Sequence, residues 1–211
     1  MRRIPVRTLS FLAGLLPLAV LVEATFRGTL GANPADALIN QTGLWALRLL
    51  LITLAVTPLR RITGWRWPGK IRRQLGLFAF FYTVLHFAAY AVLDQSLDPG
   101  AIWADLWERP FITVGFAAMV GLAPLAATST TAAMVRLGAW WPRLHRTVYL
   151  LGVLSVLHYY LLVKADIREP MIYALILGAL LGLRLLPRPW LRRLSPLRRQ
   201  RMGTPQPVPR R

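Results

Sequence analysis

The chain has 211 residues, of which 55% are hydrophobic and 16% charged, and its 26 basic and 8 acidic residues give a net charge of +18. The absence of cysteine excludes disulfides, thiolate catalysis and cysteine-ligated zinc or iron–sulfur centres. The long apolar runs exclude an ordinary soluble domain and predict an all-α polytopic membrane protein, because about 20 apolar residues cross a bilayer as a helix.

Six apolar runs predict a bundle of six transmembrane helices within residues 1–187. They cover residues 10–26, 43–59, 75–93, 111–128, 146–163 and 171–186. The first run also has the charged start and apolar middle of a signal peptide. No convincing cleavage site follows it, so we expect it to be retained as a helix. No internal repeat and no separate soluble domain is evident.

The basic residues lie mostly on one side of this predicted bundle, in segments 1–7, 60–74, 129–146 and 187–211. These four segments hold 20 of the 26 basic residues. The other six are Arg27, Arg48, Arg109, Lys164, Arg168 and Arg184. All eight acids lie toward the other side. By the positive-inside rule, both termini are expected to be cytoplasmic.

The charge therefore reads as an orientation signal, and no nucleic-acid partner is expected. Residues 188–211, basic and rich in proline, predict a flexible cytoplasmic tail held near anionic membrane lipid. Segment 60–74 is expected to be a loop along the cytoplasmic surface. Outer segment 94–110, with apolar residues among acids, predicts a short interfacial helix.

Two histidines lie inside predicted membrane helices, where an ionisable side chain usually marks a functional site. His86, in the third span, stands eight residues before Asp94, and His158, in the fifth, stands eight before Asp166. At 1.5 Å per residue, both imidazoles lie at nearly the same depth in the outer half of the membrane. Such a pair suits one iron held from both faces of a porphyrin, an arrangement that favours electron transfer. The alternative is that each histidine only hydrogen-bonds to a neighbouring helix.

Aromatic residues near the two histidines provide the apolar surroundings that haem requires, although such a stripe also serves ordinary packing. These residues are Phe80, Phe81, Phe87, Tyr90, Tyr149, Tyr159 and Tyr160.

A third histidine, His145, lies about 20 Å below His158 along the helix axis, at the cytoplasmic boundary. The corresponding level of the third span holds Arg72 and Arg73. Arginine does not replace imidazole as an ordinary iron ligand, but its planar fork suits phosphate or propionate. The residues at the inner level therefore bind either a haem, with His145 as its one firm protein ligand, or a phosphorylated group such as flavin mononucleotide (FMN). The alternative is that they are ordinary charged residues of the cytoplasmic side.

Two further arginines lie within predicted spans. Arg48 is at about the depth of Glu23, so it either pairs with Glu23, snorkels to the surface, or holds a haem propionate. Arg184 is expected to snorkel to the cytoplasmic side.

Several segments together carry a specific family resemblance. They are GLLP at 14–17, LGANP at 30–34, LLLITLAVTPLR at 49–60, RRQLGLFAFFYTVLHFAAY at 72–90, RPFITVG at 109–115, LAATST at 125–130, LHRTVYL at 144–150 and HYY at 158–160. On these segments the chain resembles the MsrQ (YedZ) family, the haem-binding membrane subunits of bacterial periplasmic methionine-sulfoxide reductase systems. That family is similar in its membrane core to ferric reductases, which stack two haems between paired histidines on the third and fifth helices. This sequence departs from the wider pattern at Arg72 and Arg73, where the inner histidine would stand.

The resemblance implies a ferric-reductase-like transmembrane electron conduit with no substrate-converting site of its own. It implies haem b between His86 and His158, an inner cofactor that is FMN or a second haem near His145, Arg72 and Arg73, and a quinol or a cytoplasmic flavin reductase as electron donor. It also implies a periplasmic molybdenum-cofactor partner, MsrP, as acceptor. The alternatives are a ferric-reductase-like or cytochrome b561-like protein with another acceptor, and a non-redox transporter or assembly protein.

Overall fold

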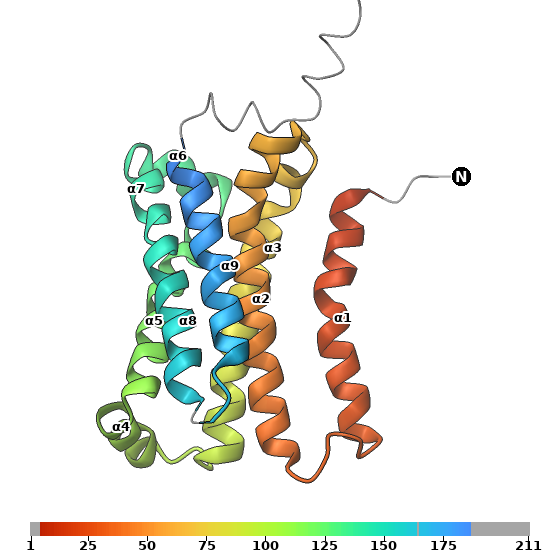
Figure 1. Cartoon of the computed structure of the whole chain (residues 1–211), viewed down its shortest axis with the longest axis vertical. Coiled ribbons are helices and arrows are strands. Elements are labelled where there is room, and N and C mark those ends of the chain that lie inside the picture. Colours follow the sequence, from red (N-terminus) through yellow and green to blue (C-terminus); the bar gives the residue numbers. More distant parts are fainter. Residues whose placement is uncertain (1–4, 164, 187–211) are drawn as a thin grey trace, which may run out of the picture.

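The computed structural model describes residues 5–163 and 165–186, so the predicted tail, 188–211, lies outside the described residues. The elements are α1 (Val6–Phe26), α2 (Pro34–Thr63), α3 (Pro68–Ala89) with the π-helical turn η1 (Tyr90–Asp94), α4 (Pro99–Glu108), α5 (Pro110–Ala127), α6 (Thr131–Leu137), α7 (Trp140–Arg146), α8 (Val148–Leu162) and α9 (Arg168–Leu185). The long helices run side by side, α4 lies across one end, and α6 and α7 lie at the other (Figure 1). The all-helical prediction is confirmed for the described residues.

Four helices of the described part are long and apolar enough to cross a membrane: Val6–Phe26, Pro34–Thr63, Pro68–Asp94 and Pro110–Ala127. The other two predicted spans correspond to α8 and α9. Helix α8 has only 15 residues, fewer than the about 17 that a span usually needs. Helix α9 carries charged residues at both of its ends. The count of six spans and the cytoplasmic side of the termini therefore stay predictions.

Helix starts follow from local chemistry. Proline is the first residue of α2, α3, α4 and α5. At this position a backbone N–H would have no acceptor within the helix, so the N–H that proline lacks is not missed. The side chain of Asn33 caps α2 by accepting from the Asp36 amide, and Asp98 caps α4 by accepting from the Gly100 amide at 2.8 Å.

The expected cytoplasmic loop at 60–74 is wrong in extent. Helix α2 continues to Thr63 and ends at Gly64, whose φ of 75° is left-handed, and α3 begins at Pro68. Only residues 64–67 connect the two helices, and most of the basic residues of this segment lie on helix ends. The thickness of the hydrocarbon layer sets the length of the apolar run, 43–59, but it does not set the length of the helix. Helix α2 therefore extends beyond the apolar run at both ends.

The core centres on α2, which packs against α1, α3, α8 and α9. Leu54 of α2 and Tyr82 of α3 are both fully buried. The hydroxyl of Tyr82 donates to the Gly14 carbonyl at 2.9 Å and accepts from the Leu18 amide at 3.0 Å. The Tyr82 hydroxyl therefore takes the place of the backbone hydrogen bond from the Leu18 amide to the Gly14 carbonyl, next to Pro17. In doing so it connects α1 to α3.

Helix α4 is the short helix that the sequence predicts within segment 94–110, and it lies across the end of the bundle (Figure 1). Its buried Asp105 accepts hydrogen bonds from Tyr90 at 2.8 Å and Gln95 at 2.9 Å, and pairs with Arg109 at 3.1 Å. These bonds join α4 to the end of α3 and the start of α5. Its other face exposes Trp103 and Trp107.

Candidate functional site

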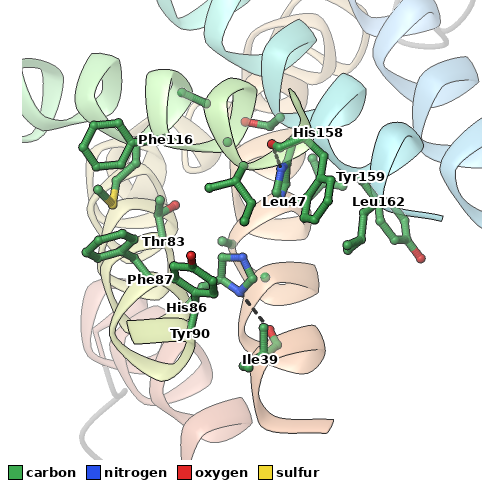
Figure 2. Close-up of a pocket in the computed structure, with 18 of the residues that line it drawn as sticks. Ile39, Leu47, Thr83, His86, Phe87, Tyr90, Phe116, His158, Tyr159 and Leu162 are labelled. Carbon is green, nitrogen blue, oxygen red and sulfur yellow. Dashed lines mark hydrogen bonds between the residues drawn. The ribbon is translucent and has the colours of Figure 1, made fainter. Parts of the chain in front are cut away.

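A cavity of about 710 Å³ lies among α2, α3, α5 and α8, with residues of α4 at one end. Its lining is mostly aliphatic and aromatic, and the side chains of His86 and His158 project into it (Figure 2). A cavity of this size, lined by apolar groups with a few polar ones, is of the kind that holds a cofactor.

His86 from α3 and His158 from α8 face each other across this cavity. Their ring centroids are 6.1 Å apart and the ring planes meet at 72°. The two side chains that the sequence analysis paired by depth are therefore neighbours in space, although they come from helices far apart in the chain.

The two imidazoles are held in the same way. Nδ1 of His86 bonds to the Ile39 carbonyl at 2.8 Å, and Nδ1 of His158 bonds to the Phe111 carbonyl at 2.6 Å. A carbonyl only accepts, so each Nδ1 carries the proton and each neutral ring keeps its lone pair on Nε2. Within the described ranges, neither Nε2 has a hydrogen-bond partner, so both lone pairs are free to bind a metal.

The distance between the rings fits one metal ion held between them. Two metal–nitrogen bonds of about 2 Å each, together with the distance from each nitrogen to its ring centre, add to roughly 6 Å. The observed 6.1 Å agrees with this sum. Among the described residues, no group of three or more His, Cys, Asp or Glu side chains is placed to hold a metal.

The cavity is built from two equivalent helix pairs, α2 with α3 and α5 with α8. Each histidine bonds to a carbonyl that stands 47 residues earlier in the chain, and the histidine numbers differ by 72. Lining residues at this offset pair as Ile39 and Phe111, Leu47 and Met119, Leu50 and Leu122, Thr83 and Ser155, His86 and His158, and Phe87 and Tyr159. In the sequence this equivalence is visible only in TVLHF at 83–87 and SVLHY at 155–159, so the sequence analysis, which found no internal repeat, did not detect it.

Charged groups gather at the α4 end of the cavity. Asp36, Asp94, Glu169 and Arg109 all line it there. Glu169 accepts a hydrogen bond from Tyr159 at 2.6 Å, so the residue after His158 is tied to the start of α9. This end of the cavity is acidic except for Arg109.

His145 lies outside this cavity, in α7 near the other end of the bundle. Its ring stacks on Trp141 with centroids 4.0 Å apart, and its Nε2 lies 3.0 Å from the Thr128 hydroxyl. Burial, and secondly the nearby positive charge of Arg72, lower the pKa of His145 below its ordinary value. This histidine is therefore neutral at pH 7 and capable of binding a metal or accepting a hydrogen bond. Arg72 is half-buried, whereas the Arg73 side chain is exposed.

Arg184 points into the bundle. Its guanidinium donates to the Tyr149 hydroxyl and, at 2.6 Å, to the Leu54 carbonyl, and it lies 4.7 Å from the centre of the Tyr149 ring. These partners, on α2 and α8, hold the Arg184 side chain in place, and its expected snorkelling to the cytoplasmic side stays a prediction. Arg72 and Arg61 lie near enough to act electrostatically on it.

Comparison with known proteins places this architecture in a family. A model of the ferric-reductase-like transmembrane component matches residues 42–156. The haem-binding subunit MsrQ of protein-methionine-sulfoxide reductase from Rhodospirillum rubrum is 53% identical over 178 residues, covering 84% of this chain and 86% of the relative. The MsrQ proteins of Xanthomonas axonopodis pv. citri (47%, covering 97% and 95%) and Bordetella pertussis (49%, covering 85% and 88%) are similarly related. The chain belongs to the MsrQ family. No solved structure matches it.

The match to the family model covers α3 and α5 completely and parts of α2 and α8, and it ends two residues before His158. Among the aromatic residues proposed to surround the histidines of this MsrQ family chain, Phe87, Tyr90 and Tyr159 line the cavity. Phe80, Phe81, Tyr149 and Tyr160 do not belong to its lining. Phe111 and Phe116 line it instead, and the 72-residue offset from α2 is the signal that would have found them.

Arg48 does not belong to the lining of this cavity. Its Nε donates to the Tyr173 hydroxyl at 2.9 Å, and its guanidinium lies 5.2 Å from the centre of the Trp45 ring. The ion pair between Arg48 and Glu23 that the sequence analysis considered does not form, because Glu23 pairs with Arg27 at 2.7 Å. Arg109, which the sequence analysis left among the outer-side charges, is the arginine that reaches the cavity.

Proposed function

We propose that this MsrQ family chain is the haem-binding electron-transfer subunit of a methionine-sulfoxide reductase system in the bacterial inner membrane. The observation that carries the proposal is the pair of imidazoles, 6.1 Å apart, whose free Nε2 atoms share one cavity. The haem-binding function named for the relatives supports the same reading.

In this proposal His86 and His158 hold haem b from its two faces. Haem iron held by two imidazoles alternates between its ferric and ferrous forms and carries one electron at a time. The chain supplies the conditions for that role. The Nδ1 bonds to Ile39 and Phe111 fix both tautomers, and the aliphatic and aromatic lining keeps bulk water from the metal.

We further propose six transmembrane spans with both termini in the cytoplasm. The asymmetry of the basic residues supports this orientation. The α4 end of the cavity then faces the periplasm, where a molybdenum-cofactor reductase, MsrP, takes up the electrons. The carboxylates at that end, among them Asp36 and Asp94, favour a partner whose docking rim is basic.

The inner level is proposed as the electron entry site. His145 is neutral, its ring is fixed by Trp141, and Arg72 and Arg184 supply positive charge. The eight acids of the sequence all lie toward the other end. This set suits the phosphate of FMN, or the propionates of a second haem with His145 as its one firm protein ligand. The donor is a quinol or a cytoplasmic flavin reductase.

The deciding experiment is the absorption spectrum of the detergent-purified protein, oxidised and dithionite-reduced, with haem and extracted flavin counted per chain. Low-spin b-type bands are expected, and they should disappear in His86→Ala and His158→Ala but persist in His145→Ala. Wild-type protein without haem, made in cells with ample haem, would overturn the proposal and leave a non-redox membrane protein.

The acceptor is tested separately. Dithionite-reduced protein, freed of excess reductant, is mixed with purified MsrP and a methionine-sulfoxide peptide. Reoxidation of the haem that depends on both additions supports the assignment. Reoxidation at the same rate without MsrP points to another acceptor, as for a ferric-reductase-like cytochrome.

A further inference from the structure

Each cavity histidine lies directly against a glycine of the neighbouring helix. A Cβ atom added to Gly43 of α2 would stand 3.0 Å from Nδ1 and Cε1 of His86. A Cβ atom added to Gly115 of α5 would stand only 2.6 Å from Nδ1 and 2.7 Å from Cε1 of His158. Neither position therefore accepts a side chain unless the imidazole moves or rotates.

The reason is the place at which each histidine meets its carbonyl. Gly43 follows Ile39 by four residues, and Gly115 follows Phe111 by four. Four residues is about one helical turn, so each glycine sits directly above the carbonyl that its histidine binds. A side chain there would occupy the path by which the ring reaches the backbone oxygen.

This arrangement is particular to the two histidine contacts. Among the glycines of the described residues, only Gly43 and Gly115 have a histidine as the nearest group. Gly121, also on α5, meets the Leu151 side chain instead, and Gly178 on α9 meets nothing within 4 Å. The two glycines also stand 72 residues apart, the same offset as the histidines, so both half-sites share one design.

We propose that Gly43 and Gly115 are positioning residues that set the separation of the two imidazoles, so that both Nε2 atoms bind one iron. The inference rests on the proposed haem function and deepens it. By letting each ring lie close against the helix backbone, the glycines fix both the ring position and the bond from Nδ1 to the carbonyl.

Two measurable properties depend on this positioning. The first is the coordination of the iron, because a displaced ring leaves one position open, and the ferric spectrum then gains a high-spin component while the ferrous form binds carbon monoxide. The second is the reduction potential. An imidazole that donates from Nδ1 is a more basic ligand, which favours the ferric state, so a lengthened Nδ1 bond shifts the potential upward.

The test uses the haem-loaded, full-length protein in detergent with four single variants. Gly115→Ala and Gly43→Ala add the Cβ atom against a histidine. Gly121→Ala adds one between the same two helices, α5 and α8, but against Leu151, and so controls for overpacking. Gly178→Ala controls for the substitution itself. Spin state, carbon monoxide binding, reduction potential and haem retention are measured on each.

The expected result is a high-spin component, carbon monoxide binding and an upward shift in potential for Gly115→Ala. A smaller change of the same kind is expected for Gly43→Ala, which has the wider clearance. Gly121→Ala and Gly178→Ala should keep the wild-type low-spin spectrum, even if Gly121→Ala unfolds at a lower temperature.

Two outcomes overturn the inference while leaving haem binding intact. One is a wild-type spectrum in both Gly115→Ala and Gly43→Ala, and the other is the same spectral change in Gly121→Ala as in Gly115→Ala. If Gly115→Ala does not accumulate, the comparison of Gly43→Ala with the two controls decides by the same criteria. Absence of haem from the wild-type protein is a different result, because it removes the proposed function itself.

Discussion

His86 and His158 bond through Nδ1 to backbone carbonyls that stand the same 47 residues before them, Ile39 and Phe111. The two rings therefore approach the cavity from equivalent helix pairs and present equivalent nitrogens to its centre. A ligand with two similar faces, such as a planar macrocycle with a central metal, matches this symmetry better than a ligand with one functional face.

The attachment of α1 to the bundle should depend on the hydroxyl of Tyr82. Tyr82→Phe leaves the Gly14 carbonyl and the Leu18 amide without their buried partner, which costs about 1–3 kcal/mol. Thermal unfolding in detergent should shift to lower temperature. The haem spectrum should not change, because no residue of α1 lines the cavity. An unchanged unfolding temperature would contradict this account of how α1 is held.

At the inner level, Arg72 should matter more than Arg73 although the two are adjacent. Arg72 is half-buried and acts on His145, whereas the Arg73 side chain is exposed. If FMN occupies this site, Arg72→Gln should weaken its binding about tenfold, the value of one charge-assisted hydrogen bond. Fluorescence of released flavin measures this, with Arg73→Gln as the matched control. Equal losses in the two variants would show that only the overall positive charge counts.

At the outer end, substitution of Arg109 should affect haem retention, whereas substitution of Arg48 should not. Arg109→Gln removes the ionic partner of buried Asp105 and a polar group of the cavity. The bonds from Tyr90 and Gln95 to Asp105 remain, so we expect a local cost of about 1–2 kcal/mol. Hydrogen–deuterium exchange in α4 should rise and haem retention should fall.

Arg48→Gln is the control for that experiment, because Arg48 binds Tyr173 outside the cavity. In the Arg48→Gln variant, hydrogen–deuterium exchange in α4 and haem retention should match those of the wild-type protein. Loss of haem from Arg48→Gln but not from Arg109→Gln would restore Arg48 as the propionate-binding candidate.

The orientation of the bundle is open to a direct test, since the chain has no cysteine. Ala104→Cys on α4 and Ala132→Cys on α6 introduce single exposed thiols at opposite ends of the molecule. In cells with a permeabilised outer membrane, an impermeant maleimide should label Ala104→Cys directly. Ala132→Cys should react only after the inner membrane is opened. The reverse pattern would invert the topology, and labelling of both would place α4 and α6 on one side.

Much of this molecule follows from the sequence alone. Apolar run lengths and the prolines at helix starts determine the helices, and the basic segments indicate the orientation. The shared depth of His86 and His158 follows from the constant rise of an α-helix. Each of these depends on local composition or on counting along one element, so no knowledge of the neighbouring helices is needed.

The tertiary structure alone decided the partners across helices. It determined that Nε2 rather than Nδ1 faces the cavity, that Arg109 and not Arg48 reaches it, that Arg184 turns inward to Leu54, and that Gly43 and Gly115 lie under the imidazoles. Helix rotation and packing set these contacts, and a rotation of a few tens of degrees changes which side chain faces which neighbour. Hydropathy inside a membrane varies little around such helices, so the sequence pattern does not specify that rotation.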